Sequence, residues 1–404
     1  MTDSDARIRG EAVPSTDRPA AVLYRARSVF DGVSAIPGPA GVLVDGGRVV
    51  QVGDAAELAG SAPAEHDFGH GVIVPGFVDA HTHVTLRPGE GDQDGQSMAP
   101  AAWQTIRGFA NLRRMLASGV TTARIMTEEH RIDLEYRGAI ERGEVTGPRL
   151  LVSGVGLSPP GGHGCVGPGV AGTGPLRAAV RSRAEDQVDH IKVFMTGGMS
   201  SPGGALMDSQ YSQSEIAAVV EEAAEHGLKV SAHAHGGPGV AFAVAAGIHS
   251  IEHGVMLSAK DAGAMAERGV RLVLTTTILH HPDGLERGDG ANPAMLAKIR
   301  QGREVSARTA ALVRESGVEI AVGTDSMHGL FGHELSWLVE HGWSPREALV
   351  AATSGGAAVL ERDDIGVLRP GSRADFVVLA GDPLDDIAAT RDVAAVYQDG
   401  RHVA

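Results

Sequence analysis

The stretch VIVPGFVDAHTHV, residues 72–84, combines an apolar strand with a pair of histidines at its end. Side chains alternate along a strand, so residues i and i+2 share one face, and the imidazoles of His81 and His83 can reach one metal ion. A single His-x-His pair is a weak signal. Its weight depends on whether other strands of the chain end in similar groups.

Seven further short apolar segments follow along the chain, and segments with apolar residues at helical spacing lie between them, as in residues 213–227 and 260–269. Ser344, Pro345 and Glu347 predict the capped start of one such helix. The further strands are expected within residues 119–128, 148–154, 190–196, 228–236, 248–254, 270–277 and 319–326. Eight parallel strands with right-handed helical crossovers predict an α/β fold, a (β/α)8 TIM-type barrel over residues 71–361. A doubly wound open sheet is the alternative, but both of its edges would need covering.

The two ends of the chain have a different pattern. Apolar and polar residues alternate within residues 21–54 and 374–403, and Asp45-Gly46-Gly47 predicts a hairpin turn. We therefore expect residues 21–70 and 362–404 to form a small composite β-sandwich domain. Residues 1–20 lack the apolar stretch of a signal peptide and are expected to form a flexible polar tail.

Composition narrows the classes of partner. The chain has 404 residues, 43% of them hydrophobic, and a formal net charge of −15. That charge argues against a nucleic acid or an anionic membrane as partner, and no apolar run is long enough to span a bilayer. The single cysteine, Cys165, permits no internal disulfide, so a cytoplasmic location is expected. A small-molecule substrate is expected, and the sequence is compatible with a homo-oligomer.

Titratable side chains recur where the predicted strands end. In a barrel of this type the reactive residues gather at the C-terminal ends of the strands. Lys192 is unusual because it stands among apolar residues, where an unpaired charge costs several kcal/mol or more. Besides His81 and His83, the chain places Lys192 on strand four, His233 and His235 on strand five, His253 on strand six and Asp325 on strand eight.

The motifs PGFVDAHTHV, IKVFMTGG, HAHGG, IEHG and GTDS, in this order, resemble the amidohydrolase superfamily. The strand-four lysine followed by Gly-Gly resembles its binuclear branch of prolidase-like dipeptidases and ochratoxinase-like amidases. This resemblance implies two divalent metal ions, with zinc preferred and manganese, cobalt or iron left open. It implies His81, His83 and Asp325 on one metal, His233 and His253 on the other, and Lys192, carboxylated by CO2, as the bridge.

The environment of Lys192 agrees with that implication. Burial favours the neutral amine, which can add CO2, and the two oxygens of the resulting carbamate can bridge two metal ions. The alternative is an ordinary buried ion pair, with Asp186 or Asp189 as the nearest candidate partner.

The predicted function is hydrolysis of an amide C–N bond by a hydroxide that bridges the two metals, with Asp325 as general base and then general acid. His235 is expected to contact the oxyanion or the substrate. The resemblance favours a dipeptide or an N-acyl amino acid as substrate, and His163, Tyr211 and Arg124 are the predicted substrate contacts.

Three alternatives stay open. A cyclic amide or lactone hydrolase could use the same binuclear centre. A deaminase is disfavoured because no glutamate follows His233 in an HxxE arrangement, and a scaffold without chemistry is disfavoured because the ligand set has no gap. His280 and His281 follow strand seven beside a polar loop that could close over substrate or form plain surface.

Overall fold

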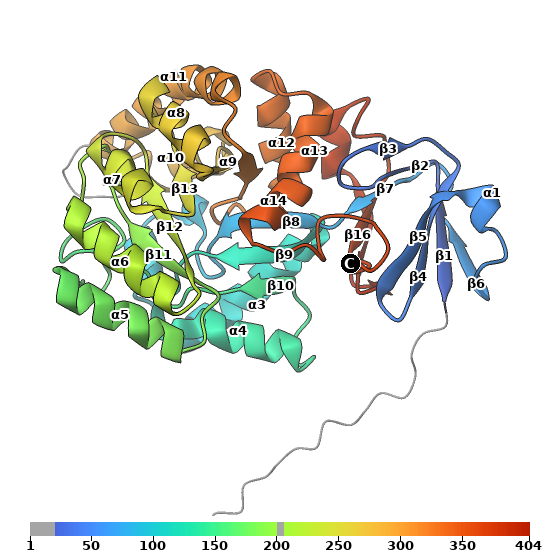
Figure 1. Ribbon diagram of the computed structural model, residues 1–404, viewed down its shortest axis with the longest axis horizontal. Coiled ribbons are helices and arrows are strands. Elements are labelled where there is room, and N and C mark those ends of the chain that lie inside the picture. The colour runs from blue at the N-terminus through green and yellow to red at the C-terminus, as the bar shows by residue number, and fades with distance from the viewer. Residues whose placement is uncertain (1–20, 200–205) are drawn as a thin grey trace, which may run out of the picture.

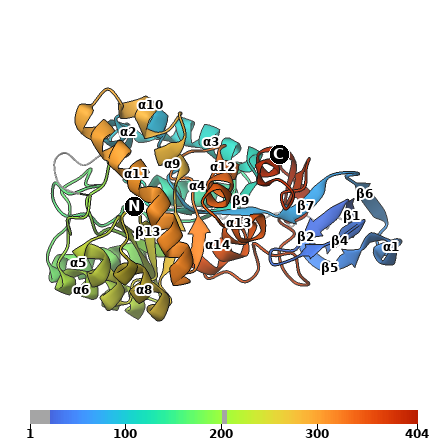
Figure 2. The same cartoon turned by 90° about the horizontal axis from the view of Figure 1, so that it is seen from above.

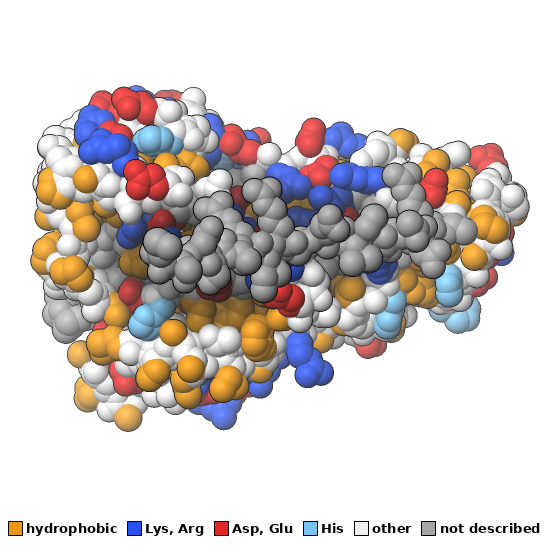
Figure 3. All heavy atoms as spheres, turned by 90° about the horizontal axis from the view of Figure 1, so that it is seen from below, with side chains coloured by type: hydrophobic (Ala, Val, Ile, Leu, Met, Phe, Trp, Pro, Cys, Tyr) orange, Lys and Arg blue, Asp and Glu red, His pale blue; other side chains and the backbone are white. Residues whose placement is uncertain are grey.

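The computed structural model describes residues 21–199 and 206–404 of the chain, so the tail expected at residues 1–20 lies outside the described residues. Figures 1 and 2 show a large part in which helices surround the central strands, with a lobe of β-strands from the N-terminal segment at its side. Within the described part of the chain, no helix is both long and apolar enough to cross a membrane. On the face drawn in Figure 3, acidic side chains (red) and basic side chains (blue) lie interspersed with one another.

All eight predicted strands of the middle section are present, and every paired neighbour is parallel. The strands are β8 (Phe77–Thr82), β9 (Val120–Ile125), β10 (Arg149–Leu151), β11 (His190–Phe194), β12 (Lys229–Ala234), β13 (Ser250–His253), β14 (Arg271–Leu274) and β15 (Ile320–Val322). Their ladders form a three-stranded sheet, β10-β9-β8, and a five-stranded sheet, β11-β12-β13-β14-β15. The predicted α/β fold with eight parallel strands is thus present, but the strand ladder of a closed (β/α)8 barrel is interrupted at two seams.

The first seam lies between β10 and β11. After β10 the chain leaves the ladder, and the Asp133 carboxylate accepts hydrogen bonds from the backbone N–H groups of Ser153 and Gly154 at 3.2 and 2.8 Å. The chain pairs with β11 itself from Leu157, whose N–H donates to the carbonyl of Lys192 at 2.8 Å. A side chain thus satisfies the backbone groups that a continuous strand would have paired.

The second seam lies between β15 and β8. The Asp79 carboxylate accepts hydrogen bonds from the backbone N–H and the hydroxyl of Thr324 at 3.0 and 2.6 Å. The N–H of Asp325 donates to the carbonyl of His81 at 2.9 Å. These contacts hold the end of β15 against β8 without a ladder between them.

Helices cover the outer side of the strands (Figure 1). The longer ones are α3 (Ala101–Ala117), α4 (Ile132–Glu141), α5 (Thr173–Glu185), α6 (Gln213–Glu225), α7 (Pro238–Ala246), α8 (Ala259–Arg268), α11 (Pro293–Ser316), α12 (Phe331–Glu340), α13 (Pro345–Ala352) and α14 (Ser354–Val359). The predicted capping box of α13 is confirmed, because the Ser344 hydroxyl accepts from the N–H of Glu347 and the Glu347 carboxylate accepts from the N–H of Ser344. Short helices α2 (Gln93–Ser97), α9 (Thr277–His280) and α10 (Leu285–Asp289) lie in the loops after the strands.

The terminal segments form two further sheets that share one hydrophobic cluster. Their strands are β1 (Val22–Ala26), β2 (Ser28–Phe30), β3 (Ala35–Ile36), β4 (Ala40–Asp45), β5 (Arg48–Asp54), β6 (Ala64–Asp67), β7 (Val72–Pro75), β16 (Phe376–Leu379), β17 (Val393–Gln398) and β18 (Arg401–His402). The sheet orders are β5-β4-β1-β6 and β18-β17-β16-β7-β2-β3. The predicted hairpin between β4 and β5 is confirmed, with Gly46 and Gly47 at positive φ. Since β7 pairs with β16 and β2, this β-sheet assembly reaches past the expected boundary at residue 71.

Candidate metal centre and active-site cavity

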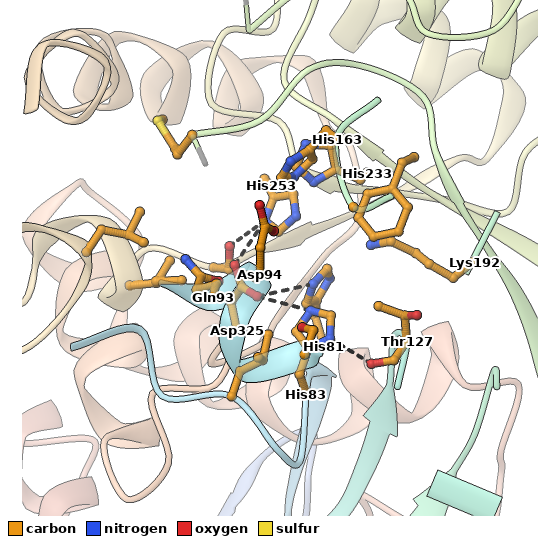
Figure 4. Close-up of a pocket in the computed structure, with 18 of the residues that line it drawn as sticks. His81, His83, Gln93, Asp94, Thr127, His163, Lys192, His233, His253 and Asp325 are labelled. Atoms are coloured by element: carbon orange, nitrogen blue, oxygen red, sulfur yellow. Dashed lines mark hydrogen bonds and ion pairs between the residues drawn. The ribbon is translucent and has the colours of Figure 1, made fainter. Parts of the chain in front are cut away.

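A cavity lies at the C-terminal ends of the central strands, where the sequence predicted the reactive groups. Figure 4 shows their side chains projecting from different strands toward its centre. The predicted residues that line it are His81, His83, His163, Lys192, His233, His235, His253 and Asp325. The parallel strands thus bring together groups that are up to 244 positions apart in the chain, as His81 and Asp325 are.

His81, His83 and Asp325 form a group whose ligand atoms all lie within 4.8 Å of one another. The Asp325 carboxylate is 3.6 Å from His81 Nε2 and 3.5 Å from His83 Nε2. Burial alone would raise the pKa of Asp325, but the hydrogen bond from His83 and the positive charge of Lys192 help to lower it to about 2. An ionised carboxylate beside two imidazoles is a donor set that suits a divalent metal ion.

The His81 nitrogen that faces Asp325 makes no hydrogen bond with another described residue. His81 Nδ1 lies 2.7 Å from the Glu252 carboxylate, and Nε2 is buried without a hydrogen-bond partner among the described residues. Burial, together with the charge of Lys192, lowers the pKa of His81 to about 4, so the ring is neutral at neutral pH. A buried, unpartnered imidazole nitrogen next to Asp325 fits a metal ligand.

His233 and His253 lie beside this group, with ring centroids 4.6 Å apart. Each ring uses one nitrogen elsewhere: His253 Nδ1 is 2.7 Å from the hydroxyl of Thr275, and His233 Nε2 is 3.2 Å from the carbonyl of Gly197. Burial holds the pKa of both imidazoles well below the ordinary value. Both rings are therefore neutral, and each has a second nitrogen that could bind a metal.

Lys192 is buried in the cavity wall, with 1% of its surface exposed. Its Nζ lies 5.1 Å from the ring centre of Phe194, and among the described residues it has neither a hydrogen bond nor an ion pair. The alternative of an ordinary ion pair is wrong, because Asp186 pairs with Arg131 and Asp189 pairs with Arg137. Burial lowers the pKa of Lys192 to about 8, so a fraction of the amine is neutral near physiological pH.

His235 and His163 lie in the same cavity. Both ring nitrogens of His235 are buried and without a hydrogen-bond partner in the described part of the chain. Burial lowers the pKa of His235 to about 4 and that of His163 to about 3. The ring of His163 is 4.4 Å from that of His233. His163 and His235 thus both line the cavity beside the histidine cluster.

Two predicted substrate contacts lie elsewhere. The Tyr211 hydroxyl donates to the carbonyl of Val170 at 2.8 Å, and the ring is buried outside the cavity lining. Arg124 lies in the barrel interior, where Nε donates to the carbonyl of Ala80 at 2.7 Å and Nη2 to Glu252 at 2.8 Å. Contrary to expectation, neither side chain lines the cavity, because both are committed to partners within the fold.

His280 and His281 are also outside this cavity. They line a separate pocket with His333 and Trp337, and His280 Nε2 is 3.0 Å from the hydroxyl of Ser306. The polar loop that follows them does reach the cavity, because Leu285 lines it, whereas the two histidines themselves do not.

The sequence interpretation missed Glu252, whose carboxylate is fully buried beneath His81. The available signal was an acidic residue inside a short apolar strand, where it needs a partner. It also missed Glu128, which accepts hydrogen bonds from the N–H and hydroxyl of Thr85 and so holds the loop that follows His83. Burial raises the pKa of Glu128 to about 7.

Several known proteins are similar to this chain in sequence and in fold. Residues 72–403 match the Amidohydrolase family. Ochratoxinase of Aspergillus niger is 28% identical over 372 residues, which cover 80% of this chain and 73% of that protein. A solved Xaa-Pro dipeptidase with bound methionine in the active site is 27% identical, with a TM-score of 0.86 over 95% of this chain and 99% of the other. A prolidase complexed with N-methylphosphonate-L-proline is 29% identical, with a TM-score of 0.87 and the same coverage. Since the family match spans most of the chain, this protein is an enzyme of the amidohydrolase family.

Proposed function

We propose that this enzyme hydrolyses the amide bond of dipeptides at a binuclear metal centre. The observation that carries the proposal is the convergence of His81, His83 and Asp325 with an unpaired buried lysine, Lys192, in one cavity. The two dipeptide-cleaving relatives named above support the substrate class.

His81, His83 and Asp325 would hold one divalent ion, and His233 and His253 a second, with zinc as the metal that best suits imidazole and carboxylate ligands. Bound ions would polarise the substrate carbonyl and lower the pKa of the attacking water. The neutral amine of Lys192 attacks the carbon of CO2, so that an N–C bond forms and a proton leaves to solvent. The resulting carbamate replaces a buried cation with an anion that two cations can stabilise.

Asp325 is the group that moves the proton. Its carboxylate is ionised because its pKa is about 2, and it faces the histidine cluster. It accepts a proton from the attacking water and returns that proton to the leaving nitrogen. His235, neutral and without a partner among the described residues, donates a hydrogen bond to the carbonyl oxygen as negative charge develops on it.

The cavity wall favours a dipeptide over an N-acyl amino acid. Asp94 and Glu129 line the cavity, and neither carboxylate has a hydrogen bond or an ion pair within the described residues. Figure 4 labels Asp94 among the residues that line the cavity. A dipeptide carries a free ammonium group that these carboxylates could bind, whereas an N-acyl amino acid carries none. The apolar lining residues are Leu86, Val166, Phe194, Met199, Val255, Ile278, Leu279 and Leu285.

The test compares kcat/KM of the zinc-loaded, bicarbonate-treated enzyme for a dipeptide, its N-acetyl form and its C-terminal amide. We expect kcat/KM for the free dipeptide to exceed that for the N-acetyl form by about tenfold or more, because one charge-assisted hydrogen bond typically contributes at least that factor. Asp94→Asn should reduce that preference. The control Glu141→Gln, at the end of α4 and outside the cavity lining, should leave it unchanged.

Equal kcat/KM for the dipeptide and its N-acetyl form would contradict the role of the ammonium group. Activity on lactones or cyclic amides without activity on any linear amide would favour the alternative hydrolase reaction at the same centre.

A further inference from the structure

Hydrogen bonds link three buried polar side chains from three different strands, and the last of the three is the metal-site residue His81. Arg124 of β9, Glu252 of β13 and His81 of β8 are 3%, 0% and 1% exposed. Arg124 Nη2 donates to Glu252 Oε1 at 2.8 Å, and Glu252 Oε2 is 2.7 Å from His81 Nδ1. The hydroxyl of Ser250 also donates to Glu252 Oε1, at 2.6 Å. This interior network ends on the imidazole whose other nitrogen faces Asp325.

The donor and acceptor inventory of these groups allows only one arrangement. A guanidinium can only donate hydrogen bonds, and an ionised carboxylate can only accept them. Because Arg124 and Ser250 occupy one oxygen of Glu252 as donors, the short contact of the other oxygen requires a proton on His81 Nδ1. The neutral ring of His81 then has its lone pair on Nε2, the atom 3.6 Å from Asp325.

We propose that Arg124 and Glu252 are positioning residues that fix His81 in the tautomer needed to bind a metal ion. The inference rests on the proposed metal centre, and it assigns a purpose to a buried ion pair that never meets the substrate. A neutral imidazole exchanges readily between its two tautomers, and only one of them presents a lone pair to the cavity. Such outer partners typically change metal affinity by about 10–100-fold when they are removed.

Glu252→Gln tests this logic with almost no change of shape. The amide oxygen must still accept from Arg124 and Ser250, so the NH2 group is turned toward His81. That group donates, which places the lone pair of His81 on Nδ1 and the proton on Nε2, where it blocks a metal. We expect the affinity for zinc to fall by about 10–100-fold.

A double variant provides the rescue. Arg124→Met combined with Glu252→Gln removes the obligatory donor together with the charge it balanced. The introduced amide can then turn, so that its oxygen accepts from His81 and its NH2 donates to the hydroxyl of Ser250. We expect zinc affinity to return toward the wild-type value. The control Ser250→Ala removes one hydrogen bond from the same carboxylate but leaves the tautomer of His81 unchanged, so it should bind zinc nearly as wild type does.

Zinc affinity is measured on metal-free full-length protein by competition with a chromophoric chelator, and folding of each variant is checked by circular dichroism. Wild-type zinc binding, loss in Glu252→Gln and recovery in the double variant would support the inference. Equal affinity of Glu252→Gln and wild type would overturn it, and so would an equal loss in Glu252→Gln and the double variant. Failure of wild type to bind zinc would contradict the proposed function instead.

A second measurement needs no variant at position 252. Long-range ¹H–¹⁵N spectra of metal-free, ¹⁵N-histidine-labelled wild type report the tautomer of each ring, and the signal of His81 is assigned by its absence in His81→Asn. A protonated Nδ1 supports the inference, and a protonated Nε2 overturns it whatever the outcome of the zinc titration.

Discussion

Lys192 is the residue whose surroundings differ most from its usual ones. The structure buries its amine without a counter-ion among the described residues, and the burial lowers its pKa from 10.5 to about 8. Between these two values the unfolded chain holds more protons on this group than the folded protein does, so the free energy of unfolding rises with pH across this window. Below about pH 8 the penalty for burying the charged amine is present in full, and above about pH 10.5 it is gone.

A comparison with Lys192→Met tests this effect, because the methionine side chain is unbranched, only one atom shorter than that of lysine, and cannot titrate. In metal-free and bicarbonate-free buffer, the unfolding free energy of wild type relative to the variant should rise between pH 7.5 and 10, by at most about 3 kcal/mol. Urea denaturation at the two pH values measures it. A difference that does not change with pH would show that Lys192 keeps its ordinary pKa.

Asp325 is the residue proposed to transfer the proton during hydrolysis. Asparagine keeps its size and one coordinating oxygen, but it cannot accept the proton of the attacking water. We expect Asp325→Asn to lower kcat by about 10²–10⁴-fold, as loss of a general base typically does. The metal content of the same sample must be measured beside the rate. Near wild-type turnover would assign the proton transfer to another group in the cavity, with His235 as the next candidate.

At the scale of elements, the seam between β15 and β8 sets the position of Asp325. Gly323 lies so close to β8 that a Cβ atom there would be 2.5 Å from the backbone nitrogen of His81. Asp79 and the bond between Asp325 N–H and His81 carbonyl complete the contact. Since Asp325 and His81 are placed by the same seam, a change in strand spacing also changes the metal-site geometry.

Gly323→Ala should therefore force the two strands apart, with a cost of about 1–3 kcal/mol, as for other overpacked cores, and a loss of activity. Gly263→Ala is the matched control. Gly263 lies within α8 with nothing within 4 Å of the added methyl group, so the variant should gain about 0.5–1 kcal/mol from helix propensity and keep full activity. Chemical denaturation and kcat on a dipeptide measure both effects. An active, fully stable Gly323→Ala variant would show that the seam can widen without consequence.

The proposed metal centre would join residues of β8, β11, β12 and β13 with Asp325, which lies three residues beyond the end of β15. Ions bound across these elements stabilise the folded state because the unfolded chain cannot assemble the site. At a free zinc concentration of one hundred times Kd, the gain is about 2.7 kcal/mol. This gain in stability should apply to most of the chain, because all these strands share one hydrophobic core and are expected to unfold together.

We expect elemental analysis of the purified enzyme to find close to two divalent ions per chain, and chelation to lower both activity and the thermal midpoint. Adding zinc with bicarbonate should restore both. One ion per chain in fully active protein would contradict the binuclear centre but agree with a single site at His81, His83 and Asp325. Full activity without any ion would contradict both.

The sequence alone determined the eight central strands, the hairpin at Gly46-Gly47 and the capping box at Ser344, because all of these depend on residues close together in the chain. It also placed the metal-site candidates at strand ends, since alternation along a strand and the order of the strands are local properties. Only the tertiary structure decided which side chains enter the cavity. The sequence of a strand that is buried along its whole length, such as β9, does not reveal whether Arg124 points to its open end or into the interior.

The two seams and the network beneath His81 depend on residues far apart in the chain. Asp79 and Thr324 are 245 positions apart, and His81 and Glu252 are 171 apart. Their hydrogen bonds exist because strand twist and side-chain volume bring particular atoms within reach, and neither property can be read from short segments. Local motifs thus identify the residue types that carry the chemistry of the site. The hydrogen bond proposed to set the tautomer of His81 forms only when distant strands pack together.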